Sequence, residues 1–165
     1  MTHNSSIKEQ VLHPTHSAPT SVQARSAATE PTTMAELDER VITALRAAAE
    51  KKAIDMVVLD LREIASFTDF FVIVSGSNER QVQAISDEVS ETLKKSGSPA
   101  ARVEGYKTAE WILLDYGDFV VHVFDEKARR FYDLERLWRE SKRVILPPEF
   151  ASGVKGVNSS LRSES

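Results

Sequence analysis

Apolar residues repeat with helical and strand periods between residues 33 and 148, and they predict alternating helices and strands. The first helix is predicted over 33–51, where one apolar stripe follows a capping box of Thr33 and Glu36. Residues 55–61 and 69–76 are apolar runs of strand length. The second is apolar on both faces, which is typical of a central strand.

The second half of the pattern completes an α/β order. A helix is predicted over 78–95, a short strand over 101–105, and two strands within 110–125. Residues 126–142 show a helical pattern again, with Phe131, Leu134, Leu137 and Trp138 as its apolar side. The order α-β-β-α-β-β-β-α predicts an α/β fold with a mixed sheet of about five strands flanked by helices.

Composition predicts one folded domain between two tails. Residues 1–33 are rich in Ser, Thr and Pro without any aromatic residue, so we expect a disordered tail. Residues 34–148 form the predicted domain, and residues 149–165 are expected to be a flexible C-terminal tail. No apolar run approaches the ~20 residues of a membrane span, and the N-terminus lacks a signal-peptide core. We therefore expect a cytoplasmic protein with no membrane contact.

Two strands around Tyr116-Gly117 predict a hairpin with a binding face. If these two residues form the turn, Asp115 pairs with Asp118, Leu113 with Val120 and Trp111 with His122. The opposite face is almost entirely apolar and is assigned to the core. The mixed face, which consists of Trp111, Leu113, Asp115, Asp118, Val120 and His122, is the predicted site for a protein partner.

The chemistry of this face suits a basic partner. Trp111 and Leu113 would act as apolar anchors, and Asp115 and Asp118 would pair with Lys or Arg of the partner. Two alternatives stay open: a helix of the same chain covers Trp111, or a homodimer buries this face. A net charge of −4 disfavours a general nucleic-acid binder.

A strand followed by Gly76-Ser77 and a helix also suggests a phosphate-binding turn. Metal-assisted phosphoryl transfer needs paired carboxylates on the next strand, where only Glu104 occurs. With no cysteine and one histidine (His122) in the domain, we expect no metal site, cofactor or catalytic residue. Ser77 or Asn78 as a helix N-cap explains the stretch without a ligand. The alternative is a residual nucleotide-binding or nucleotidyltransferase module that uses this turn.

Three segments together resemble the ribosomal silencing factor (RsfS/Iojap) family. They are "KKAIDMVVLDL" (51–61), "DFFVIVSGSNERQVQAISDEV" (69–89) and "EGYKTAEWILLDYGDFVVHVFDEKARRFYDLERLW" (104–138). The resemblance covers about residues 36–147.

This resemblance implies a non-catalytic protein with a nucleotidyltransferase-like fold. It implies binding to the large ribosomal subunit through its fourteenth ribosomal protein. Such binding would sterically block joining with the small subunit and repress translation. A cationic final helix would add a second contact with rRNA through Arg129, Arg130 and Arg136, although an ordinary solvated helix face explains the same charges.

Overall fold

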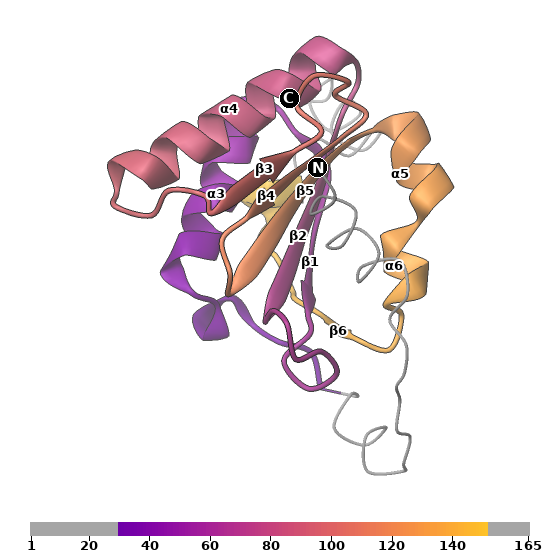
Figure 1. The fold of residues 1–165 in the computed structure, drawn as a ribbon. Helices are drawn as coiled ribbons and strands as arrows, with labels where there is room; N and C mark the ends of the chain where they lie inside the picture. Colours follow the sequence, from indigo (N-terminus) through magenta and orange to yellow (C-terminus); the bar gives the residue numbers. More distant parts are fainter. Residues whose placement is uncertain (1–29, 152–165) are drawn as a thin grey trace, which may run out of the picture.

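The computed structural model describes residues 30–151 and contains one mixed sheet with helices on both faces (Figure 1). Its six strands lie in the order β3-β4-β5-β2-β1-β6. The strands are β1 (Ile54–Asp60), β2 (Phe70–Gly76), β3 (Arg102–Glu104), β4 (Trp111–Asp115), β5 (Phe119–Asp125) and β6 (Lys142–Arg143). Only β2 and β5 pair in parallel. The predicted mixed α/β sheet is confirmed, with β6 as a strand that the sequence did not predict.

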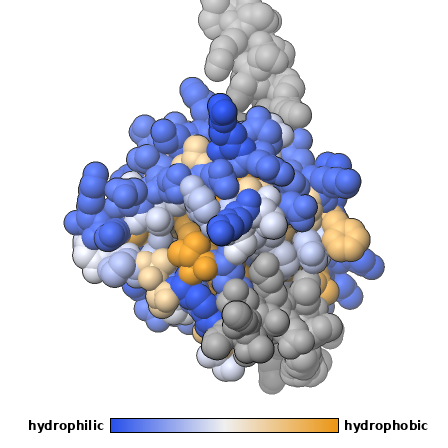
Figure 2. Space-filling view, turned by 45° about the horizontal axis from the view of Figure 1, so that its top comes forward, coloured by the Kyte–Doolittle hydropathy of each residue, from blue (hydrophilic) through white to orange (hydrophobic). Residues whose placement is uncertain are grey.

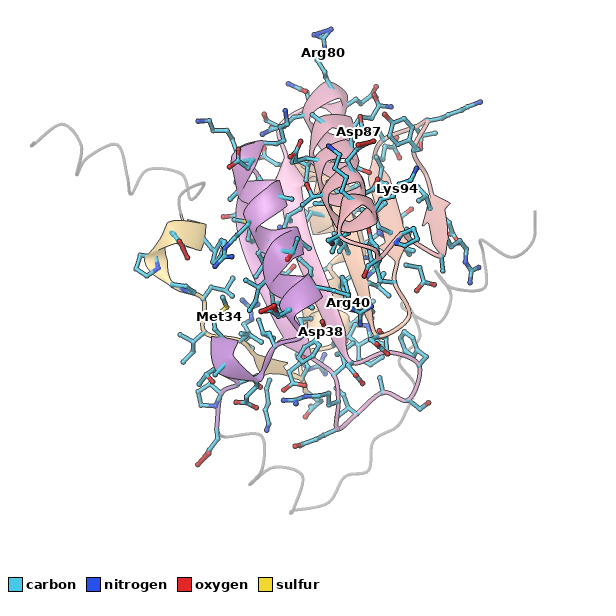
Figure 3. All side chains as sticks on the ribbon, turned by 90° about the vertical axis from the view of Figure 1, so that its left-hand side faces the viewer. Met34, Asp38, Arg40, Arg80, Asp87 and Lys94 are labelled. Carbon is cyan, nitrogen blue, oxygen red and sulfur yellow. The ribbon has the colours of Figure 1, made fainter. Side chains whose placement is uncertain are left out.

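Helices α3 (Glu39–Glu50) and α4 (Glu79–Lys95) cover one face of the sheet, and α5 (Glu126–Tyr132) and α6 (Leu134–Leu137) cover the other (Figure 1). The predicted stripe of α4 is buried in the first core. Asn78 caps α4 by accepting a hydrogen bond from the Gln81 amide at 2.8 Å. The outer side of α4 carries charged residues, among them Arg80, Asp87 and Lys94 (Figure 3).

The start of the first helix differs from the prediction. Glu36 does accept a hydrogen bond from the Thr33 amide at 3.1 Å, as a capping box requires. This box, however, starts only the single 3-10 turn η1 (Met34–Glu36). Helix α3 begins at Glu39, where Asp38 accepts a hydrogen bond from the Arg40 amide at 2.9 Å.

The final helix is also interrupted. Asp133 adopts a left-handed conformation with φ 46°, which ends α5 and starts α6 in a new direction. Leu134 and Trp138 are buried by this change of direction, whereas Phe131 stays 78% exposed. The predicted apolar side of this segment is therefore divided, and Phe131 does not share the burial of Leu134 and Trp138.

The ends of the described chain pack against the domain. Thr32 is buried, bridges to Val144, and donates a hydrogen bond from its hydroxyl to Asp60. Phe150, in the 3-10 turn η2 (Pro148–Ala151), is buried in the core beside α3. The rest of the predicted tails lies outside the described residues. Within residues 30–151, none of the helices has the length and apolar character needed to span a membrane.

Candidate partner-binding surface

The β4–β5 hairpin has a register that differs by two residues from the predicted one. Asp115 lies opposite Val120, Leu113 opposite His122, and Trp111 opposite Phe124. The Tyr116 amide donates to the Phe119 carbonyl at 3.0 Å, so the turn residues are Gly117 and Asp118. The predicted pairs are therefore wrong. Because the shift is even, Trp111, Leu113, Val120 and His122 still share one side of the sheet.

That shared side is buried, which contradicts the prediction of an exposed face. We call it the inner face: Trp111, Leu113, Val120, His122 and Phe124, each at most 4% exposed. Side chains of α5, α6 and the residue after α6 pack onto it, namely Ala128, Leu134 and Trp138. The alternative in which a helix covers Trp111 is correct. A homodimer would have to use some other surface.

Trp111 lies at the centre of the inner face. Its indole packs on Phe124 with ring centroids 4.9 Å apart and on Tyr132 at 4.6 Å. Trp111 Nε1 donates a hydrogen bond to His122 Nδ1 at 3.1 Å. Because Nδ1 accepts this bond, the buried imidazole is the neutral tautomer that carries its proton on Nε2. This bond therefore satisfies Trp111 Nε1 and His122 Nδ1 inside the core.

The two aspartates lie at the accessible end of the hairpin, the hairpin tip (residues 115–118). The side chain of Asp118 is 66% exposed and contacts Arg40 Nη2 at 2.8 Å. Asp115 is 15% exposed, lies 3.8 Å from Arg102, and accepts a hydrogen bond from the Gly117 amide. Hydrogen bonds from Arg40 to Asp38 and Asp118 raise the pKa of that guanidinium, which stays charged. Each aspartate therefore already has an arginine of this chain nearby.

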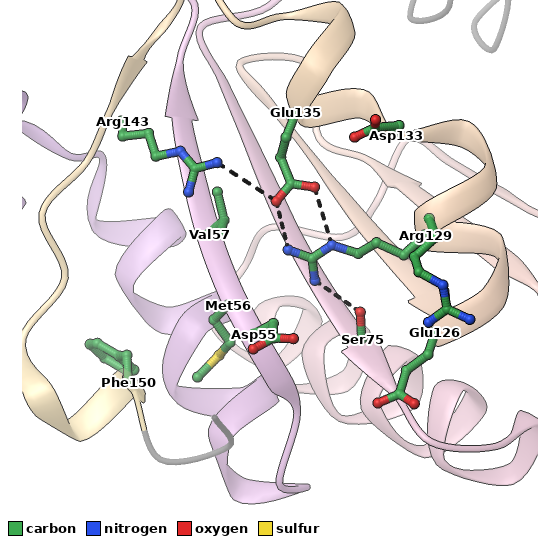
Figure 4. Close-up of a pocket in the computed structure, with 11 residues that line it drawn as sticks. Asp55, Met56, Val57, Ser75, Glu126, Arg129, Asp133, Glu135, Arg143 and Phe150 are labelled. Carbon is green, nitrogen blue, oxygen red and sulfur yellow. Dashed lines mark hydrogen bonds and ion pairs between the residues drawn. The ribbon is translucent and has the colours of Figure 1, made fainter. Parts of the chain in front are cut away.

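A groove of about 670 Å³ lies where the parallel strands β2 and β5 end (Figure 4). Arg129 reaches into it from α5, donates to Ser75 Oγ at 2.9 Å and pairs with Glu135 at 2.9 Å. Arg143 approaches the same carboxylate at 3.8 Å. The Arg129 side chain is only 12% exposed. Arg129 is therefore part of an internal ion-pair network, whereas Arg130 and Arg136 lie on the surface.

The Gly76-Ser77 turn is occupied by the chain itself. The Ser77 amide and hydroxyl both donate to Gln81 Oε1, at 2.7 and 2.9 Å. A Cβ on Gly76 would lie 3.0 Å from the Val82 amide nitrogen, so the glycine permits close packing of strand and helix. Glu104 is buried on β3, which is separated from β2 by the two strands β4 and β5, or about 14 Å at the usual strand spacing. In residues 30–151, no cluster of three or more His or acidic side chains could hold a metal ion.

Two features of the surface concern the segment 126–143. One is Phe131, the most exposed large apolar side chain in the described part of the chain. The other is the separation of charge. Residues 126–143 contain seven Lys and Arg and four Asp and Glu. The rest of residues 30–151 contains ten Lys and Arg and nineteen Asp and Glu. The face shown in Figure 2 is mainly hydrophilic, with a few small apolar groups.

Comparison with known proteins identifies relatives along most of the chain. The family described as ribosomal silencing factor during starvation matches residues 34–164. A ribosomal silencing factor of Halalkalibacterium halodurans is 43% identical over 103 residues, covering 62% of this chain and 88% of the relative. A mouse protein named mitochondrial assembly of ribosomal large subunit protein 1 is 28% identical over 124 residues, covering 68% and 54%.

A solved structure agrees in fold. A crystal structure of a Chromobacterium violaceum protein superimposes with a TM-score of 0.61 at 33% identity, covering 68% of this chain and 90% of that one. The family match spans all the described helices and strands, including the inner face and the helices α5 and α6 that cover it. By sequence and by fold, this chain belongs to the ribosomal silencing factor (RsfS/Iojap) family.

Proposed function

We propose that this protein binds the large ribosomal subunit and sterically blocks its joining with the small subunit, which lowers translation. Membership of the silencing factor family supports this function. The name of the mouse relative, which refers to the large ribosomal subunit, supports the choice of subunit. Bacterial relatives support action in the cytoplasm. The alternative is action in an organelle, because the name of the mouse relative refers to mitochondria.

The observation that carries the proposal is the separation of charge between the segment 126–143 and the rest of one small domain. The segment 126–143 has a surplus of three positive charges, and the remainder of residues 30–151 has a surplus of nine negative charges. A ribosomal surface offers matching partners, because rRNA is anionic and ribosomal proteins are commonly basic. Complementary potentials of this kind favour correct orientation and fast association.

We assign the acidic contact to the hairpin tip and the fourteenth protein of the large subunit. Asp118 is exposed enough to exchange its arginine partner within the chain for one on the ribosome. Asp115 ends β4 at the same hairpin tip. The buried Trp111 and Leu113 would support this tip from below rather than touch the partner. Arg130 and Arg136 are exposed and suit a second contact with rRNA.

Occlusion requires binding and no chemical step. The prediction that the chain is not an enzyme agrees with its membership of a family of silencing factors. The strand, Gly-Ser turn and helix are compatible with descent from a nucleotidyltransferase-like fold. Because Gln81 already accepts from both donors of Ser77, we assign this turn a structural role and prefer occlusion to nucleotide binding.

Sedimentation with purified large subunits, followed by a subunit-joining assay, tests the proposal. Wild-type protein should co-sediment and reduce joining in proportion to the occupied fraction. Asp115→Asn combined with Asp118→Asn should weaken binding about 2- to 10-fold, with a smaller effect at high salt. Asparagine at 115 can still accept the hydrogen bond from the Gly117 amide.

The matched control is Glu50→Gln combined with Glu91→Gln, which removes two exposed charges from α3 and α4. Binding that is equally weak in both double variants would show only a general charge effect and remove the hairpin tip from the proposal. Folded wild-type protein that neither sediments with large subunits nor affects joining would overturn the proposed function itself.

A further inference from the structure

We infer that α5 presents a stacking platform for an unpaired nucleobase of RNA, formed by Lys127, Arg130 and Phe131. We call these three residues the α5 platform. The inference deepens the proposed function and rests on it, because it names the kind of rRNA that the cationic side of the domain recognises. It also predicts single-stranded RNA binding by the isolated protein, which the proposed function does not require.

The three residues share one exposed side of α5. Positions 127, 130 and 131 are related by spacings of three and four, which place side chains next to each other on a helix. All three are exposed. Phe131 is 78% exposed, compared with 58% for Ile145, the next most exposed large apolar side chain in the described residues. The platform is therefore one aromatic ring beside two cations.

The Phe131 ring is held by the core. It meets Tyr132 in an edge-to-face contact with centroids 5.0 Å apart and an interplanar angle of 88°. Tyr132 packs in turn on the buried Trp111. The left-handed conformation of Asp133 ends α5 directly after these rings and keeps Phe131 out of the core. Because this contact restricts the orientation of the ring, binding would lose less side-chain entropy than for a ring without a neighbour.

The charge around the ring is available to a ligand. Among residues 30–151, no ion pair involves Lys127 or Arg130, in contrast to Arg129 on the inward side of α5. Arg136 and Arg139 extend the exposed cations along the chain, and Glu140 is the only fully exposed acid in 126–143. The platform thus combines an aromatic ring for a base with cations for the neighbouring phosphates, as single-strand binding sites do.

Other ligands fit this surface less well. A lipid surface binds an apolar helix face several residues long, and α5 exposes only one apolar ring. A duplex hides the faces of its bases inside the stack, so Phe131 could reach only unpaired positions. An acidic protein segment would use the cations but would gain nothing specific from a flat ring.

The test measures binding of a fluorescently labelled 12-nucleotide RNA to the full-length protein, as a single strand and as a duplex of the same sequence. Phe131→Ala should weaken single-strand binding about 5- to 150-fold, the range seen when one stacked base is lost. Duplex binding should change much less. Phe131→Trp should keep the affinity, and its exposed indole fluorescence should be quenched when the single strand binds.

The cations are tested by salt dependence. Lys127→Ala combined with Arg130→Ala should reduce the slope of log K against log salt by about 1.4, because two phosphate contacts to a single strand are lost. Lys94→Ala combined with Lys95→Ala, on the distant helix α4, removes the same charge and should leave most of the slope. Thermal melts of all variants confirm folding.

Several results would overturn the inference. They are wild-type affinity in Phe131→Ala, equal loss for single strand and duplex, or unquenched Phe131→Trp fluorescence in the bound state. If Phe131→Ala instead lowers large-subunit binding and leaves RNA binding intact, the ring contacts a ribosomal protein. The proposed function would then stand without the RNA platform. If wild-type protein binds RNA but does not bind large subunits, the RNA platform would stand without the proposed function.

Discussion

Replacing Trp111 distinguishes a core role from a role in partner contact. The side chain is 4% exposed and packs on Phe124 and Tyr132. Truncation of such a residue to Ala typically costs about 3–5 kcal/mol of unfolding free energy. The loss also leaves His122 Nδ1 without the donor that now satisfies it. Phe131→Ala, at a 78% exposed position, should change stability by no more than about 0.5 kcal/mol.

Urea unfolding followed by circular dichroism measures this difference directly. With a slope of about 2 kcal/mol per molar urea, Trp111→Ala should lower the midpoint by about 2 M. Trp111→Phe should fall between, losing about 1–3 kcal/mol, since it keeps an aromatic ring but removes the donor to His122 and part of the buried ring volume. A Trp111→Ala midpoint within about 0.3 M of wild type would refute the burial argument. Weak ribosome binding by Trp111→Ala would then report on contact rather than on folding.

Three further changes test the framework around the site. Arg62→Ala should cost about 1–3 kcal/mol at pH 7, because it removes charged donors from Asp60, which is 5% exposed. Burial raises the pKa of Asp60, but the hydrogen bonds it accepts outweigh this effect and hold the pKa below its ordinary value. The stabilisation is therefore complete at neutral pH and is lost as the pH falls through the folded-state pKa of Asp60. The loss of unfolding free energy in Arg62→Ala, measured by urea titration, should therefore become smaller in acid. A loss that does not depend on pH would contradict this. Gly76→Ala should lower the unfolding free energy by about 1–3 kcal/mol through crowding against Val82, and an unchanged melting temperature would show that the helix can move away. Asp133→Gly should keep or raise the melting temperature, whereas Asp133→Val should lower stability by about 1–2 kcal/mol, because β-branched residues tolerate the left-handed conformation poorly; equal melting temperatures would argue against strain there.

The elements that could be predicted from the sequence are those that carry their own local signal. Strand β2 is apolar on both faces and is fully buried, and α4 has a four-residue stripe, a capping Asn78 and a terminating Gly97. Strand β6 has only two residues, Lys142 and Arg143, and forms because the chain returns beside β1. Nothing local marks such a strand. Its existence depends on tertiary structure.

The hairpin register could be predicted only in part. Gly117 has φ 85°, a conformation that glycine supplies in tight hairpin turns, so its place in the turn is confirmed. Glycine can occupy either central position of a two-residue turn, and the structure uses the first, followed by Asp118. Choosing the wrong position moves every cross-strand partner by two residues and leaves each side chain on its original face. The sequence therefore predicted which residues share a face of the hairpin, but it did not predict which residues pair across the two strands.

Alternation along a strand shows which residues share a face, but it does not show what covers that face. Trp111 and His122 suggested a surface because their face mixes apolar, aromatic and charged side chains, yet Trp111 Nε1 and His122 Nδ1 satisfy each other within the core. The cover comes from the following segment, whose Leu134 and Trp138 reach the sheet only because Asp133 turns the chain. The same turn leaves Phe131 outside. The conformation of Asp133 thus explains two differences from the predictions. It allows the following segment to cover Trp111, and it leaves Phe131 exposed to solvent. The search for the ribosome-binding residues should therefore begin on the outer side of α5.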